Sequence, residues 1–233
     1  MESIINDDNL NPFGKNIIIP KPKHKPHQSV CGLNMIDDDS WKIIEDKVIN
    51  NINLDFNKAN VANYGVDNDV DKDNVLLSKY DPNIRKSKIC FLEYDEEINK
   101  LLGKMVADYN RLYSNWKYDI EKIEDAQVTH YYEGDFYNWH VDQFEINGLR
   151  HEEGEEFNRK ISVTIWLNEP EEYEGGEFDL ETRGPKEKMR YDTFKLPKKS
   201  IIIFPSNVWH RVRPVTSGVR KSLVLWFTGP PFR

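Results

Sequence analysis

The sequence predicts a mainly β protein, with a closed or double-sheet β architecture in its second half and supporting helices before it. After about Ile120, eight short β-rich runs follow one another, separated by turn residues. Two stretches before that point repeat their apolar residues at helical spacing instead. A chain of 233 residues can bury one full core and a small lobe. We therefore expect an extended arm over residues 1–30, a helical support segment packed on the core over 31–120 and a β domain over 121–233.

Two amphipathic helices are expected in the support segment. The first starts at Asp39/Ser40, residues typical of helix N-termini, and its apolar positions are Trp41, Ile44, Val48 and Ile52. A strand is expected over Lys88–Leu92, before the second helix, which starts near Asp95. One face of that helix carries Ile98, Leu101, Leu102, Met105, Tyr109 and Leu112. Core packing explains both apolar faces.

The expected strands are short and closely spaced. They cover Ala126–Tyr132, Phe136–Asp142, Lys160–Leu167, Glu177–Leu180, Met189–Leu196, Ser200–Phe204, Trp209–Val212 and Val219–Phe227. Between two of them, Glu174-Gly175-Gly176-Glu177 is typical of a turn, because glycine adopts positive φ at no steric cost.

Composition narrows the class of protein. A net charge of −8 disfavours a chain whose main role is to bind nucleic acid through its phosphates. Two cysteines, Cys31 and Cys90, are too few for a disulfide framework and lack C-x-x-C spacing. Residues 67–78 alternate carboxylates as a calcium loop does, but Lys72 replaces the required glycine. No run of about 18 apolar residues and no secretory signal pattern occurs, so we expect a cytoplasmic protein with no membrane contact.

His140-Val141-Asp142 is the first candidate site. Residues two apart on a strand face the same side, so this imidazole and carboxylate converge on one point. His210 lies in another β-rich run that can reach the same point. Two histidines and one carboxylate leave open positions on a metal, which is the ligand set of non-haem Fe(II) oxygenases. An H-x-D pattern alone is weak, because it also describes a buried histidine near a surface aspartate.

Arg220 strengthens this interpretation. In the run Gly218–Trp226, its side chain faces the same side as Ser222 and Val224. A charged group that a strand points inward needs a partner. An anionic cosubstrate supplies one, because a guanidinium binds a carboxylate in bidentate geometry.

Taken together, these motifs resemble the Fe(II)/2-oxoglutarate-dependent dioxygenases, in particular their prolyl 4-hydroxylase-like branch. The resemblance runs from about Gln127 to Phe227 and keeps the motifs in order. They are Tyr131-x-x-Gly134-x-x-Tyr137-x-x-His140-x-Asp142, Arg159 through Leu167, Glu174-Gly175-Gly176-Glu177-Phe178 and His210-Arg211-Val212-x-Pro214-Val215-x-x-Gly218-x-Arg220. The fold that the resemblance implies is a double-stranded β-helix, a jelly-roll variant.

The resemblance also implies roles for individual residues. His140, Asp142 and His210 match the iron ligands of the family, and Arg220 matches the cation that binds the distal carboxylate of 2-oxoglutarate. Tyr131 matches a tyrosine that hydrogen-bonds the same carboxylate, and Ser222 matches an assisting serine. Positions that line the substrate mouth in prolyl hydroxylases correspond to Tyr137, Arg159 and Trp226. Aromatic core packing is the alternative for Tyr137 and Trp226, and an exposed strand charge is the alternative for Arg159.

The implied activity is hydroxylation of an unactivated C–H bond, with Fe(II), 2-oxoglutarate and O2 consumed to give succinate and CO2, and with ascorbate supporting turnover. Asp142 favours hydroxylation over halogenation, since halogenases of this superfamily lack the carboxylate. We expect a peptidyl prolyl substrate, with a free amino acid or another small molecule as the alternative. AlkB-type demethylation of nucleic acid is less expected, because no second arginine follows Arg220 at the usual distance. A non-catalytic binding module would not need the intact ligand set.

Overall fold

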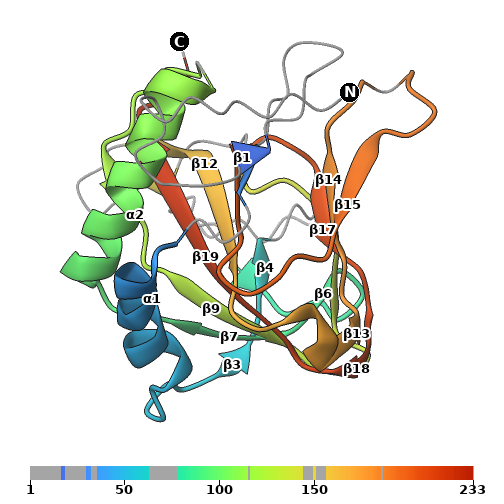
Figure 1. The fold of residues 1–233 in the computed structure, drawn as a ribbon. Coiled ribbons are helices and arrows are strands. Elements are labelled where there is room, and N and C mark those ends of the chain that lie inside the picture. Colours follow the sequence, from blue (N-terminus) through green and yellow to red (C-terminus); the bar gives the residue numbers. More distant parts are fainter. Residues whose placement is uncertain are drawn as a thin grey trace.

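The computed structural model describes residues 17–18, 30–32, 36–62, 78–114, 116–143, 149–150, 156–184 and 186–232. Within them, two β-sheets form a jelly roll, and two helices cover the outer side of the larger sheet (Figure 1). The predicted fold class, mainly β with flanking helices, is confirmed.

The helices are α1 (Asp38–Ile44), continued by the π-helical turn η1 (Glu45–Ile49), α2 (Glu96–Asp108), continued by η2 (Tyr109–Tyr113), and the short 3-10 helix η3 (Pro170–Glu172). The strands are β1 (Ile17–Ile18), β2 (Val30–Gly32), β3 (Asn57–Lys58), β4 (Val61–Ala62), β5 (Ser78–Lys79), β6 (Arg85–Lys86), β7 (Lys88–Phe91), β8 (Lys122–Ile123), β9 (Gln127–Tyr131), β10 (Phe136–His140), β11 (Leu149–Arg150), β12 (Glu156–Trp166), β13 (Tyr173–Gly175), β14 (Phe178–Glu181), β15 (Tyr191–Phe194), β16 (Ile201–Pro205), β17 (His210–Val212), β18 (Val215–Gly218) and β19 (Arg220–Gly229).

The major sheet has the order β1-β2-β16-β12-β19-β9-β7-β3. Its central strands β12 and β19 are its longest and pair antiparallel from Asn158↔Gly229 to Trp166↔Ser222. The minor sheet has the order β15-β14-β17-β10-β6. Apolar side chains from both sheets, including Trp166, Phe178 and Phe204, fill the space between them. These side chains form the apolar core between the two sheets.

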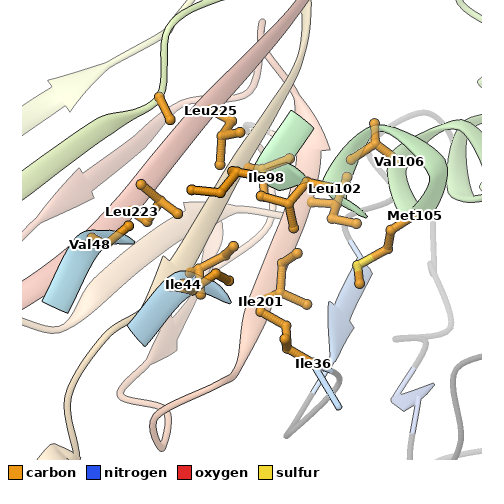
Figure 2. Close-up of a cluster of buried hydrophobic side chains, with 14 of the residues drawn as sticks. Ile36, Ile44, Val48, Ile98, Leu102, Met105, Val106, Ile201, Leu223 and Leu225 are labelled. Carbon is orange, nitrogen blue, oxygen red and sulfur yellow. The ribbon is translucent and has the colours of Figure 1, made fainter. Parts of the chain in front are cut away.

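A second core lies between the major sheet and the helices. Figure 2 shows Ile44, Ile98 and Leu102 from the helices packed against strand residues such as Ile201 and Leu223. Burial of this kind stabilises by roughly 1.5–3 kcal/mol for each large aliphatic side chain. The helices thus fix the major sheet from the side opposite the minor sheet.

Both helices begin at aspartate caps. The Asp95 side chain accepts hydrogen bonds from the backbone N–H groups of Glu97 and Ile98, as the sequence predicted. The first helix is capped by Asp37, two residues before the predicted start at Asp39/Ser40.

The predicted apolar faces are wrong at their C-terminal ends. Ile52 is 94% exposed and Leu112 is 71% exposed, so neither belongs to the core. Each helix ends in a π-helical turn, η1 or η2, whose wider winding rotates later residues away from the 3.6-residue period.

The support segment is not solely helical, because β2, β3 and β7 extend the major sheet and β6 extends the minor sheet. Most of the predicted arm lies outside the described residues, but Ile17–Ile18 pairs with β2. The calcium-like stretch lies almost entirely outside the described residues. No helix among the described residues is long and apolar enough to cross a bilayer.

The glycine turn forms as predicted. Gly175 and Gly176 have φ of 68° and 65°, and β13 pairs with β18 beside them. A Cβ on Gly175 would lie 2.3 Å from the Pro214 carbonyl oxygen. Only glycine fits there, and the turn brings the chain back beside Arg220.

Candidate metal and cosubstrate site

Strands β10 and β17 of the minor sheet bring the two histidines together. His140 and His210 are directly opposite each other in the antiparallel pair, and their ring centroids are 4.1 Å apart. Asp142 lies two residues beyond the end of β10, rather than within the strand as predicted, and its backbone N–H donates to the Ser206 carbonyl. One ligand atom from each of His140, Asp142 and His210 falls within 4.8 Å of the others.

Backbone carbonyls fix the tautomer of both imidazoles. Nδ1 of His140 lies 2.7 Å from the Asn138 carbonyl oxygen, and Nδ1 of His210 lies 2.9 Å from that of Val208. A carbonyl only accepts, so each Nδ1 carries the hydrogen and each Nε2 keeps its lone pair. The two Nε2 atoms lie 3.7 and 3.5 Å from the Asp142 carboxylate.

The protonation states suit a divalent metal ion. Burial, reinforced by His210, lowers the pKa of His140 well below its usual value. Burial raises the pKa of Asp142, but its electrostatic interactions with His210, His140 and Arg159 outweigh this effect and bring the pKa to about 2. At neutral pH the site therefore presents a neutral His140 and an ionised carboxylate, which are the forms that bind metals.

Arg220 lies on the floor of the same cavity. It is 1% exposed, and its Nη1 donates to Ser222 Oγ at 3.2 Å. Its Nε and Nη2 find no hydrogen-bond partner among the described residues. The Tyr131 ring centroid is 5.4 Å from the guanidinium carbon. A buried cation is costly when two of its nitrogen donors, Nε and Nη2, make no hydrogen bond. This position therefore fits an anionic ligand such as a carboxylate.

One cavity of about 1490 Å³ joins these groups. All nine residues singled out in the sequence line it: Tyr131, Tyr137, His140, Asp142, Arg159, His210, Arg220, Ser222 and Trp226. Tyr137 stacks on His140 with centroids 3.4 Å apart, and burial raises its pKa to about 12. The Arg159 guanidinium lies 3.8 Å from the Trp226 ring centroid. Arg159 is therefore not an exposed strand charge.

Sequence reasoning missed two residues of this cavity region. Arg85, on β6, is 6% exposed, lines the cavity and places its guanidinium 4.5 Å from the Tyr137 ring centroid. Glu124 pairs with Arg159. Arg85 lies in a two-residue strand, which is too short to show periodicity, and Glu124 is 35 positions from its partner.

Part of the chain is similar in sequence to known proteins. Residues 126–228 match the model of the 2OG-Fe(II) oxygenase superfamily. A PKHD-type hydroxylase of Hyphomonas neptunium is 38% identical over 94 residues, which is 40% of this chain and 38% of that protein. A PKHD-type hydroxylase of Aliarcobacter butzleri is 40% identical over 104 residues, covering 41% of this chain and 39% of that protein. The matches thus span about two fifths of the length of these curated relatives.

A solved structure shows the same fold over more of the chain. It is a prolyl hydroxylase from Trichoplax adhaerens in complex with a peptide fragment of the hypoxia inducible factor oxygen degradation domain. Its TM-score is 0.57 at 21% identity, with 85% of this chain and 82% of that chain covered. Residues 126–228, less than half of the chain, are thus similar to the 2OG-Fe(II) oxygenase superfamily.

The family implies Fe(II), 2-oxoglutarate and O2, and the residues present fit them. Two imidazoles and a carboxylate in one cluster form a 2-His-1-carboxylate set. The unused N–H groups of Arg220 supply the place for a carboxylate.

Proposed function

We propose that the protein is an Fe(II)- and 2-oxoglutarate-dependent oxygenase that hydroxylates a prolyl residue in a peptide or protein. One observation carries the proposal: the His140, Asp142 and His210 ligand atoms converge in the same cavity as the buried guanidinium of Arg220, whose Nε and Nη2 have no hydrogen-bond partner among the described residues. The similarity to PKHD-type hydroxylases and the fold shared with a prolyl hydroxylase support the reaction class.

In this proposal, His140, Asp142 and His210 hold Fe(II), and Arg220 holds the distal carboxylate of 2-oxoglutarate. When bound, the metal and cosubstrate supply oxidation of a C–H bond by O2, with release of succinate and CO2. The chain's own contribution is positioning. The carbonyls of Asn138 and Val208 keep both imidazoles turned with Nε2 toward the metal.

Pairing of β9 with β19 positions the residues that would bind 2-oxoglutarate. Tyr131 and Arg220 are register partners on β9 and β19, so both side chains reach the same face of the sheet. In the proposal Tyr131 donates its O–H to the carboxylate that Arg220 binds, and Ser222 fixes the Arg220 guanidinium. Exclusion of water around this ion pair strengthens it.

The cavity favours a peptide over a free amino acid. Small-molecule sites are usually about 300–1,000 Å³, and this cavity is larger. Trp209, 49% exposed, also lines it, next to His210. We propose that Tyr137, Arg159 and Trp226 contact the substrate beside the metal, and that Arg85 joins them.

Anaerobic titration with Fe(II) and 2-oxoglutarate, followed by a succinate assay in air with and without proline-containing peptides, tests the proposal. We expect succinate release that rises with peptide, and its loss in His140→Ala, Asp142→Ala and His210→Ala variants that retain the fold and lose iron binding. Wild-type activity in any of these variants would contradict the ligand assignment. Slow succinate release that no peptide stimulates would contradict the peptide substrate, and failure to bind iron would overturn the whole proposal.

A further inference from the structure

Four basic residues lie opposite one another across four adjacent strands of the major sheet. Lys58 on β3 pairs with Lys88 on β7, and Lys88 pairs with His130 on β9. His130 in turn pairs with Lys221 on β19. Cα atoms of directly opposed residues are about 4.5–5.5 Å apart, so this basic row is about 15 Å long.

Three members of the basic row, Lys88, His130 and Lys221, lie on the face of the sheet away from the cavity, whereas Lys58 on the edge strand β3 also lines the cavity. Tyr131 and Arg220 follow or precede the row by one residue and face the cavity, and successive residues of a strand point to opposite sides. Lys58 and Lys88 are exposed, and His130 and Lys221 are partly buried. A ligand that binds Lys88, His130 and Lys221 would therefore lie outside the cavity.

The row lacks counter-charge within the described part of the chain. Lys58, Lys88 and Lys221 form no ion pair with a carboxylate there. By contrast, Lys47 pairs with two carboxylates and Lys86 with one. Like charges placed directly opposite each other on a sheet destabilise it. Lys58 and Lys88 are such a pair, and a bound anion would relieve their repulsion.

Aromatic rings hold the row in place without neutralising it. The Lys58 ammonium lies 5.3 Å from the Tyr80 ring centroid, and that of Lys88 lies 5.2 Å from the Tyr132 ring centroid. Phe56 stacks on His130 at 4.2 Å. Cation–π contacts orient an ammonium while leaving its charge available to a ligand.

We propose that the basic row binds an acidic protein segment, a short run of Asp and Glu residues. An extended segment places side chains of one face about 6.6–6.8 Å apart, so the row accommodates two or three carboxylates. The row contains no arginine, the residue that phosphate and nucleic-acid sites favour. The net charge of −8 also repels a long polyanion, whereas a short acidic segment meets only the row.

A fluorescein-labelled peptide of eight acidic residues, titrated by anisotropy at low salt, tests the proposal. We expect saturable binding that weakens at least tenfold in Lys88→Gln/Lys221→Gln. The matched control is Lys186→Gln/Lys188→Gln, which removes two exposed lysines from the loop between β14 and β15, and it should change affinity less than twofold. Binding should also shift the His130 imidazole resonance.

Three results would overturn the proposal. They are no binding by the wild type, an equal loss in both double variants, and tighter row-dependent binding of an oligothymidine of equal charge. The last would assign the row to nucleic acid. Circular dichroism of each variant checks that it is folded before binding is compared.

Discussion

Both carboxylate oxygens of Glu124 accept hydrogen bonds from the Arg159 guanidinium, at 2.7 and 2.5 Å. The pair joins the β8–β9 connection to β12 and holds the guanidinium against the Trp226 ring. Both side chains are mostly buried, at 15% and 21% exposed. Arg159 therefore reaches the cavity in a fixed position that depends on Glu124.

Glu124→Gln should destabilise the protein by about 1–3 kcal/mol, because it removes the carboxylate that binds a mostly buried guanidinium through two hydrogen bonds. The free energy of unfolding in urea measures this. Glu121→Gln is the control, since Glu121 is exposed and three residues away; it should change stability by less than about 0.5 kcal/mol. Equal effects of the two substitutions would contradict the role given to the pair.

Arg220→Met should leave the ligand-free protein as stable as the wild type or up to about 3 kcal/mol more stable. The substitution removes a buried cation whose Nε and Nη2 have no partner among the described residues. The same variant should lose the thermal stabilisation that 2-oxoglutarate gives the Fe(II)-loaded wild type under anaerobic conditions. Arg220→Lys should retain part of it. Unchanged stabilisation by 2-oxoglutarate in Arg220→Met would rule out this residue as its anchor.

Gly175→Ala should cost about 2–4 kcal/mol of stability. Its φ of 68° is unfavourable for alanine, and the new Cβ would meet the Pro214 carbonyl oxygen at 2.3 Å. Gly184→Ala is the matched control, because no atom lies within 4 Å of the added Cβ. Thermal and urea unfolding of the two variants make the comparison. A similar small change in both would show that the turn adapts to a side chain.

The sequence predicted the parts of this protein that local pattern determines. The β-rich runs, the Asp95 cap and the inward direction of Arg220 follow from residue type and a period of two or 3.6 residues. The strands β3 and β6 have only two residues each, which is too short for an alternating pattern of apolar and polar residues to be seen in the sequence. These strands position Lys58 in the basic row and Arg85 in the cavity. The Glu124–Arg159 pair depends on sheet register, which a single sequence does not specify.

The stability of the protein should fall as the pH is lowered from about 6.5 to about 4, in part through His130. Burial, and then the charges of Lys221 and Lys88, lower the pKa of His130 from 6.5 to about 4. In this window the unfolded chain takes up a proton at His130 that the folded protein does not, so protonation favours unfolding. His130→Gln removes this contribution, and its free energy of unfolding should drop less between pH 7 and pH 5 than that of the wild type. Lys221→Gln should also reduce the drop, because one of the two repelling charges is gone. An NMR titration of the His130 ring gives the pKa directly, and a value near 6.5 in the wild type would contradict the burial and charge repulsion assigned to this ring.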